Sequence, residues 1–415
     1  MHRVLVPLSL SILLTLIACR APEKPLPVVT KPPPATVTLP PTPVPVKKVF
    51  RDGKLPALDA AIAQAIVERK LPGGVLWLER DGIIYSKALG HRALAPQVEP
   101  MTTNTIFDAA SLTKVIATTP AIALLIERGQ LKLDAPVHIY LPEFMGDGRE
   151  RVTLRHLLTH TSGLRPGLSL AQPWQGASQA LQLTCAEKLQ SPPGTKFVYS
   201  DINFMLLGEI VRRASGEPLD IFAAREIFQP LTMNDTGFRP STAARGRIAP
   251  TTATNNVYLR GEVHDPTARR MDGVAGHAGL FTTAADLARF ARMLLNGGDL
   301  DGTRVFKLET VRLMASVQSP ATVEVRRGLG WDIDSPYSGP RGKIFPVGSF
   351  GHTGWTGTSL WIDPFSRTFV IFLSNRNHPD GGTVVALRSQ LGTLAAEAVM
   401  DFDFMKVPGA LPRKE

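Results

Sequence analysis

Cysteine is scarce in this sequence, which has two, Cys19 and Cys185, among 415 residues. So few cysteines exclude a fold held by several disulfides, and if Cys19 is modified, Cys185 has no partner within the chain. The segment around Cys185, LQLTCAEKL, is typical of an ordinary helix. We therefore do not expect a cysteine nucleophile.

Acidic residues are also under-represented: 36 Asp and Glu stand against 46 Lys and Arg, giving a net charge of +10. Part of this excess belongs to the N-terminal segments. Basic residues do not form runs interleaved with aromatic residues, so nucleic acid is not an expected partner. The net positive charge instead favours a weak attraction to anionic surfaces of the cell envelope.

An apolar run over residues 4–18 follows Arg3 and is too short for a typical membrane span. It ends in Leu-Ile-Ala-Cys19, which resembles the lipobox of bacterial lipoproteins, where the cysteine is acylated after cleavage. The resemblance implies a signal peptide over 1–19 and a lipid anchor on Cys19, with an ordinary signal peptide as the alternative. Arg20 is not the aspartate linked to inner-membrane retention, so we expect the outer membrane, facing the periplasm.

The next segment, residues 20–50, is rich in proline and resembles a tether. Such a sequence cannot pack a core and favours extended polyproline II. At about 3.1 Å per residue it reaches on the order of 80 Å. A protein-recognition role for the prolines is the less favoured alternative.

Apolar periodicity predicts the elements of the remaining chain. Residues 55–70 have helical spacing, and residues 73–90 form two apolar runs around Arg80-Asp81-Gly82, which predicts a hairpin. Helical patterns dominate from about 130 to 300, and strand patterns return after that. The simplest architecture is one sheet built from both ends of the chain, covered by helices, with a second helical lobe. The predicted divisions are a hydrolase domain over 51–405, with a sheet lobe over 55–115 and 300–400 and a helical lobe over 116–299.

Three short motifs stand out by their order and context. Ser111-Leu112-Thr113-Lys114 begins an apolar helix that ends at Gly129, Tyr199-Ser200-Asp201 precedes a second helix, and His352-Thr353-Gly354 lies on a predicted strand. Each motif alone is weak, since Ser111 could simply cap its helix. Together they match the S-x-x-K, second-motif and K-T-G set of penicillin-recognising serine enzymes.

On these motifs the sequence resembles the β-lactamase and penicillin-binding protein superfamily, in the branch of class C β-lactamases, D-alanyl-D-alanine carboxypeptidases and esterases. The segments 154–164, 199–211 and 261–298 support the resemblance, which covers about 55 to 400. It implies an α/β fold of the α+β kind: an antiparallel sheet flanked by helices, plus a mostly helical lobe, with the site between them.

The residue types indicate the chemistry. A serine hydroxyl needs a base to become a good nucleophile, and Lys114 lies one helical turn from Ser111 on the same face. Burial lowers the pKa of a lysine and favours the neutral amine, whereas a nearby ammonium stabilises a tyrosinate at Tyr199. We assign Ser111 as the nucleophile and leave proton transfer open between Lys114 and Tyr199.

Stabilisation of the tetrahedral intermediate requires hydrogen-bond donors. The backbone N–H of Ser111 lies at a helix N-terminus, which favours negative charge. The resemblance adds the backbone N–H of Trp355, the residue after the K-T-G-like triplet.

Substrate binding is expected from Asp201, His352, Thr353 and Gly354, and two of these depart from the family pattern. Asp201 replaces a common Asn, and its carboxylate could pair with Lys114. His352 replaces the K-T-G lysine, and a histidine is only partly charged near neutral pH. Strong β-lactam hydrolysis is therefore not expected.

No metal or other cofactor is expected. His156 and His160 have the i, i+4 spacing of a zinc pair, but the glutamate of an HExxH motif is missing. The resemblance makes this segment a packing and loop element. His264 and His277 flank a glycine-rich loop and are expected to have core or turn roles.

The sequence leaves three functions open. The first is an acyl-enzyme hydrolase acting on a peptidoglycan D-Ala-D-Ala stem peptide or another small molecule. The second is an esterase for small acyl esters, and the third is a catalytically silent protein that binds wall peptides. The sequence does not indicate an oligomeric state.

Overall fold

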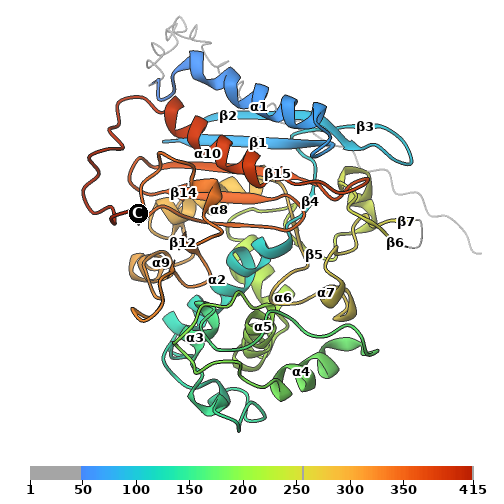
Figure 1. Cartoon of the computed structure of the whole chain (residues 1–415), viewed down its shortest axis with the longest axis vertical. Coiled ribbons are helices and arrows are strands. Elements are labelled where there is room, and N and C mark those ends of the chain that lie inside the picture. The colour runs from blue at the N-terminus through green and yellow to red at the C-terminus, as the bar shows by residue number, and fades with distance from the viewer. Residues whose placement is uncertain (1–47, 255–256, 414–415) are drawn as a thin grey trace, which may run out of the picture. The chain divides into compact units, whose positions relative to one another are not determined.

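The computed structural model describes residues 48–254 and 257–413 (Figure 1). The signal peptide expected over 1–19, the lipid expected on Cys19 and most of the tether expected over 20–50 lie outside the described residues, so they remain predictions.

The compact folded unit begins at Lys48, slightly before the predicted boundary. Phe50 is buried and forms a β-bridge with Val399, near the other end of the chain. Leu411 donates a backbone hydrogen bond to Val347. The folded unit therefore extends a few residues beyond the predicted domain at each end.

An eight-stranded antiparallel sheet, in the order β11-β12-β13-β14-β15-β1-β2-β3, is assembled from both ends of the chain. The strand β1 (Gly73–Arg80) pairs with β2 (Ile83–Ala93) and with β15 (Thr368–Ser374), which confirms the predicted antiparallel sheet. The other strands are β3 (Glu99–Pro100), β11 (Arg326–Arg327), β12 (Asp332–Asp334), β13 (Phe350–Thr353) and β14 (Ser359–Asp363).

The hairpin between β1 and β2 turns where the sequence predicts it. Asp81 and Gly82 have φ values of 50° and 81°. Two consecutive residues with positive φ are the signature of a type I′ turn, whose twist matches that of the flanking strands. Asp-Gly is a preferred pair for this turn, so the local sequence explains the hairpin.

Successive side chains of β1 pack on opposite faces of the sheet, against two different layers of helices. Leu76 and Leu78 pack with α1 (Leu55–Val67) and α10 (Val385–Ala398), which also contact each other (Figure 1). Val75, one residue out of phase, belongs to the other hydrophobic cluster, which includes residues of α8 (Ala284–Leu295). This period of two is what a strand buried on both faces requires.

The predicted division into lobes is wrong for two helices. The helix α8 lies within the range predicted for the helical lobe, yet it packs on β1 and β15, and its Arg292 forms an ion pair with the buried Glu79 of β1. In the opposite sense, α9 (Leu308–Ala315) packs against α2 (Thr119–Glu127) of the helical lobe. The chain therefore crosses between the lobes more often than sequence order suggests.

The helical lobe is built around α5 (Asp201–Ser215), which contacts α2 and the other helices of the lobe. Those helices are α3 (Leu154–Leu158), α4 (Gly176–Ala186) and α6 (Leu219–Ala223). The remaining elements are α7 (Pro266–Arg270), β4 (Phe107–Asp108), β5 (Gly237–Phe238), β6 (Ala253–Thr254), β7 (Val257–Tyr258), β8 (Leu280–Thr282), β9 (Asp299–Leu300) and β10 (Thr303–Arg304).

The apolar helix predicted from Ser111 is not continuous. It consists of a 3-10 turn, η2 (Ala110–Leu112), a π-helical turn, η3 (Lys114–Thr118), and then α2. Gly129, with φ of 76°, follows the end of α2 as predicted. The stretch Ala110–Glu127 is apolar enough to span a membrane, but 83% of it is buried in the protein, as expected for a core helix.

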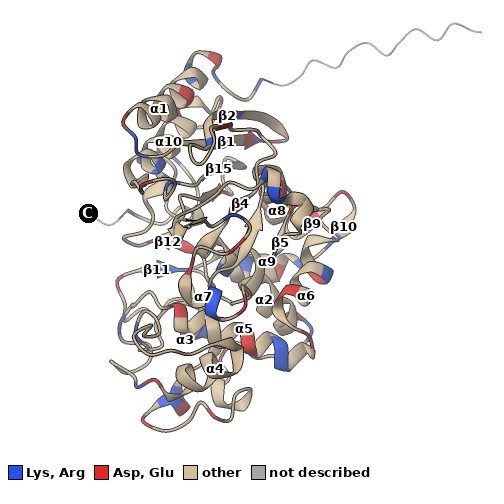
Figure 2. Cartoon of the chain, turned by 90° about the vertical axis from the view of Figure 1, so that its right-hand side faces the viewer, with Lys and Arg blue, Asp and Glu red and all other residues tan. Residues whose placement is uncertain are grey.

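Charges of both signs are mixed over the face shown in Figure 2. Several pairs join distant segments, such as Arg260 with Glu99 and Arg165 with Glu187. On the face in Figure 2, Lys and Arg are interspersed with Asp and Glu rather than gathered into one basic stripe.

Candidate active site

Ser111 lies in the 3-10 turn η2, directly after a residue with strained backbone. Ala110 has φ of 47°, a left-handed conformation that is uncommon for residues other than glycine. The Asp108 carboxylate accepts a hydrogen bond from the Ala110 N–H at 2.8 Å and another from the His264 N–H at 2.6 Å. Asp108 thus fixes the turn that presents Ser111, a role that sequence reasoning missed.

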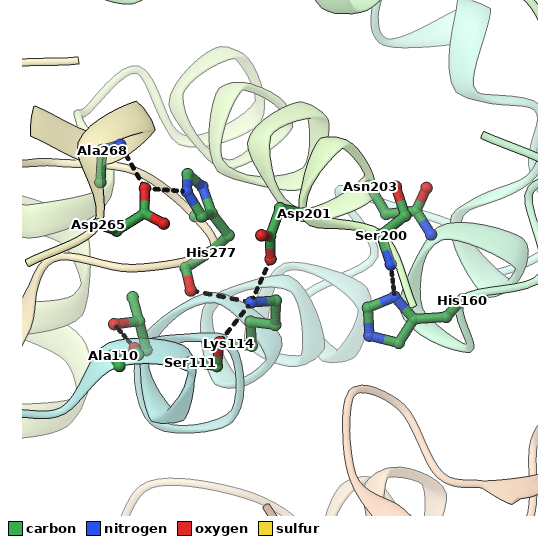
Figure 3. A network of polar contacts seen from close by, with 12 residues as sticks. Ala110, Ser111, Lys114, His160, Ser200, Asp201, Asn203, Asp265, Ala268 and His277 are labelled. Atoms are coloured by element: carbon green, nitrogen blue, oxygen red, sulfur yellow. Dashed lines mark hydrogen bonds and ion pairs between the residues drawn. The ribbon is translucent and has the colours of Figure 1, made fainter. Parts of the chain in front are cut away.

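Lys114 is fully buried, and its ammonium has three acceptors (Figure 3). Nζ lies 3.1 Å from Ser111 Oγ, 3.0 Å from the His277 carbonyl oxygen and 2.7 Å from Asp201 Oδ1. A charged lysine has three N–H donors and no acceptor. The three contacts therefore match an ammonium, and the suggested pairing of Lys114 with Asp201 is confirmed.

The expectation that burial keeps Lys114 neutral is wrong. Burial does act to lower the pKa of Lys114, but the charges and hydrogen bonds of Asp201 and Tyr199 outweigh it, so the pKa lies above its ordinary value. The charge of Asp201 is the main reason, since a carboxylate stabilises the charged form of a neighbouring lysine.

Tyr199 is half-buried beside this lysine. Its ring centroid lies 5.0 Å from Lys114 Nζ, and the ring stacks on His160 with a centroid distance of 4.4 Å. His160 Nδ1 accepts a hydrogen bond from the Ser200 N–H at 3.0 Å. His160 therefore positions the second motif, and His156 Nδ1 accepts from the Thr153 N–H instead of facing a shared metal site.

Two of the three predicted groups line one cavity of about 490 Å³, and the third, Lys114, contacts Ser111 from the buried side. Its lining contains the hydroxyl-bearing Ser111 and the phenol-bearing Tyr199, with Lys114 directly behind Ser111. The lining residues are Ser111, Tyr199, Arg327, Asp332, Tyr337, His352, Thr353, Gly354, Trp355, Arg376, Thr383, Val384, Val385 and Arg388.

The turn after β13 is fastened to the segment before Ser111. Thr356 Oγ1 donates to the Asp108 carbonyl at 2.7 Å, and Thr358 Oγ1 donates to the Ala109 carbonyl at 3.0 Å. A Cβ on Gly354 would lie 2.5 Å from the Ala109 carbonyl oxygen, so only glycine fits there. This packing brings Trp355, the expected second oxyanion donor, to the cavity that Ser111 lines.

His352, expected to be partly charged near neutral pH, is buried and carries less charge than expected. The side chain is 4% exposed, and its Nδ1 hydrogen bonds to the Thr353 carbonyl at 2.8 Å. Burial, followed by the charges of Arg327 and Lys114, places the pKa of His352 well below its ordinary value. The imidazole is therefore neutral in the folded protein near neutral pH.

Arg327 supplies a cation that sequence reasoning missed. It lines the cavity and is fully buried, and its Nε and Nη1 have no hydrogen-bond partner among the described residues. The nearest carboxylate, Asp332, lies 3.8 Å from Nη1, and burial raises the pKa of Asp332. The segment RRGLGWDID carries no signal that separates Arg327 from the adjacent, more exposed Arg326.

Asp201, Asp265 and His277 bring three potential metal-ligand atoms within 4.8 Å of one another. These groups already have partners: Asp201 pairs with Lys114, and Asp265 Oδ1 lies 3.0 Å from His277 Nε2 (Figure 3). The Lys114 ammonium thus provides the positive charge that the carboxylates need. His264 and His277, expected in core or turn roles, are half-buried and buried respectively in the loop behind Lys114.

A model of the beta-lactamase family matches residues 58–394. The "N-acetylmuramyl-L-alanine amidase" of Bacillus subtilis (strain 168) is 34% identical over 372 residues, covering 79% of this chain and 82% of that protein. The "Putative D-alanyl-D-alanine carboxypeptidase" of Escherichia coli (strain K12) is 32% identical over 372 residues, covering 80% and 85%.

The fold has solved counterparts as well. A class C beta-lactamase aligns with a TM-score of 0.69 at 21% identity, covering 85% of this chain and 98% of that one. The likeness confirms the mixed fold expected from the motifs, and the sequence matches confirm the family. The chain therefore belongs to the beta-lactamase family of serine hydrolases.

Proposed function

We propose that this hydrolase is a D-alanyl-D-alanine carboxypeptidase-like enzyme that forms an acyl-enzyme on Ser111. The observation that carries the proposal is the 3.1 Å contact of Lys114 Nζ with Ser111 Oγ, beside a cavity that the Arg327 guanidinium also lines. A nucleophile near a buried cation suits a peptide that ends in a free carboxylate. The Escherichia coli relative, named a D-alanyl-D-alanine carboxypeptidase, supports this assignment.

Lys114 and Asp201 form a lysine–aspartate base in this proposal: Lys114 takes the proton, and Asp201 sets the pH at which it can do so. Lys114 rests as an ammonium 2.7 Å from Asp201, and after it has lost a proton to solvent its amine accepts the Ser111 proton across 3.1 Å. The Ser111 oxygen attacks the substrate carbonyl, and Tyr199, on the cavity wall, relays a proton to the leaving amine. Water then attacks the acyl-enzyme, and the same groups return the proton to Ser111.

The backbone N–H groups of Ser111 and Trp355 stabilise the oxyanion. Both residues line the cavity, and the turn carrying Trp355 is fastened to the segment before Ser111. Loss of one such donor typically costs about 3 kcal/mol in the transition state.

Arg327 binds the terminal carboxylate of the substrate. A guanidinium is charged at any physiological pH and pairs with a carboxylate through two parallel hydrogen bonds. Arg327 is buried, and its Nε and Nη1 have no hydrogen-bond partner among the described residues, whereas the neutral His352 has no charge to offer.

Amidase activity is the second candidate, because the Bacillus subtilis relative at 34% identity is named as an N-acetylmuramyl-L-alanine amidase. Both reactions cleave an amide bond of a peptidoglycan fragment, but they cut at different positions. The products therefore separate the two activities.

The cellular location is also part of the proposal. Arg3, the apolar residues 4–18 and the lipobox-like ending at Cys19 support export and lipidation. The proline-rich residues 20–47 then link the lipid to the folded unit that begins at Lys48. Arg20 supports the outer membrane, with the enzyme facing the periplasm.

The test uses the full chain in detergent micelles with Ser111→Ala as the matched control. The substrates are a D-Ala-D-Ala peptide, a muramyl peptide, a fluorescent penicillin and a nitrophenyl ester. Release of D-alanine by the wild type alone supports the carboxypeptidase, and release of the intact stem peptide supports the amidase instead. Ester turnover alone indicates an esterase, and no Ser111-dependent reaction indicates a protein that only binds.

A further inference from the structure

Two arginines that line the cavity also hold the turn that carries Trp355. Arg388, from α10, donates a hydrogen bond from Nη2 to the Gly354 carbonyl at 3.0 Å. Arg376 donates from Nε to the Trp355 carbonyl at 2.6 Å, and its guanidinium carbon lies 4.7 Å from the centroid of the Trp355 ring. The carbonyl groups of Gly354 and Trp355 are therefore each bound by a guanidinium.

Arg388 is costly to bury, whereas Arg376 is half-buried. Arg388 is 8% exposed, its Nε has no hydrogen-bond partner, and neither arginine forms an ion pair within the part of the chain that the structure describes. Burial, followed by the charge of Arg376, lowers the pKa of Arg388 to about 10. A buried charge without a countercharge is unfavourable, so the position calls for a functional reason.

The geometry of the peptide unit supplies that reason. The Gly354 carbonyl and the Trp355 N–H belong to one planar peptide, and in a trans peptide these two groups point in opposite directions. A donor fixed on the carbonyl therefore directs the N–H away from Arg388. No residue in the described ranges accepts a hydrogen bond from the Trp355 N–H, so this donor is free for a substrate.

We propose that Arg388 is a positioning residue that orients and polarises the Gly354–Trp355 peptide, so that the Trp355 N–H becomes a stronger donor to the reaction oxyanion. The inference rests on the proposed acyl-enzyme function. A charged hydrogen bond on an amide carbonyl strengthens the hydrogen bond donated by the same amide's N–H. Arg376 fixes the next carbonyl and so prevents the peptide from rotating.

A competing role is that the two guanidiniums bind an anionic group of the substrate. The two roles differ in what changes when Arg388 is replaced. A positioning role lowers kcat for every substrate, neutral or charged, and leaves KM nearly unchanged. An anion site raises KM for charged substrates only.

The experiment compares wild type with Arg388→Met, Arg388→Gln and Arg376→Gln, using Arg304→Met as the control because that arginine is largely exposed. The substrates are a neutral nitrophenyl ester and an ester that carries a carboxylate. Infrared spectroscopy of the acyl-enzyme reports the carbonyl stretch, which falls when the oxyanion donors polarise the carbonyl. Circular dichroism identifies any variant that does not fold.

We expect Arg388→Met to lower kcat about 10- to 50-fold on both esters, less than the loss of a whole donor. The carbonyl stretch should move to higher frequency, with a smaller shift in Arg388→Gln. If Arg388→Met does not fold, we expect the same lower kcat and higher carbonyl stretching frequency in Arg388→Gln and Arg376→Gln. An unchanged carbonyl stretching frequency in the acyl-enzyme of Arg388→Met or Arg388→Gln would overturn this inference but not the proposed function. A KM increase confined to the charged ester would do the same. Absence of acylation on Ser111 in the wild type overturns the proposed function and this inference with it.

Discussion

Lys114 Nζ lies 2.7 Å from Asp201 Oδ1 and 3.1 Å from Ser111 Oγ, so the lysine beside the nucleophile is already paired with a carboxylate. The pair makes the resting state of the site an ion pair rather than a neutral amine. The aspartate of the second motif therefore acts on the nucleophile through the lysine, and the pH dependence of the reaction should report it.

Asp201→Asn should shift the rise of activity with pH toward lower pH. Asp201 raises the pKa of Lys114, so a lysine base becomes available only as the pH rises, and removal of the carboxylate lowers that pKa. The measurement is kcat/KM against pH with a nitrophenyl ester. Asp272→Asn, a matched change at a residue outside the cavity lining, should leave the profile unchanged. A profile that does not move in Asp201→Asn would contradict the lysine–aspartate base.

Protonation of Asp108 should reduce the activity below about pH 6. Burial raises its pKa to about 6, with the charge of Asp265 adding to the shift, while the His264 and Ala110 N–H groups and Arg269 oppose it. Protonation below that pH removes one of the two hydrogen bonds that fix the strained turn before Ser111. Asp108→Asn should lower kcat at pH 8 and abolish this acid limb.

The control for Asp108 is Asp363→Asn. Burial also raises the pKa of Asp363 to about 6, but its carboxylate bonds to Ser366 and does not line the cavity. An acid limb that persists in Asp108→Asn and disappears in Asp363→Asn would show that the assignment is wrong.

Arg327→Met should weaken binding of peptides with a free C-terminal carboxylate. A hydrogen bond to a charged group contributes about 1.5–3 kcal/mol, so KM should increase about 10- to 100-fold. The same peptide with a C-terminal amide should show no such increase, because it has no carboxylate for Arg327 to bind. Equal effects on both peptides would indicate that Arg327 has a structural role only.

Gly354→Ala should destabilise the protein and reduce turnover. The added Cβ would lie 2.0 Å from Thr358 Oγ1 and 2.5 Å from the Ala109 carbonyl oxygen, so the turn after β13 must move away from the segment before Ser111. Overpacking of this kind typically costs about 1–3 kcal/mol, which thermal unfolding measures. Gly339→Ala is the matched control, since nothing lies within 4 Å of its added Cβ. Equal melting temperatures for the two variants would contradict the close packing.

Local sequence patterns predicted much of the fold and the convergence of the site. Asp81 and Gly82 favour the hairpin turn that forms, Gly129 follows the end of its helix, and the three motifs lie in the order found in the family that the sequence resembles. The turn and the helix end depend only on a few neighbouring residues, and the meeting of the motifs was implied by the family resemblance. A single sequence was therefore sufficient to predict them.

Features that depend on packing between distant segments could not be predicted in this way. The ammonium state of Lys114 depends on how close Asp201 lies, and the neutrality of His352 depends on its burial among charged neighbours. Nothing in the sequence around Arg327 distinguishes it from an exposed arginine, yet it is buried. The helix α8 packs on the sheet although it lies in the range predicted for the helical lobe. Each of these is set by tertiary contacts.

The intact mass of the full chain after brief exposure to a slowly hydrolysed acylating agent tests the central claim most directly. The account predicts a single added acyl group, located by peptide mapping on the peptide that contains Ser111, and no adduct in Ser111→Ala. An unmodified wild-type protein, or an adduct on another residue, would contradict it.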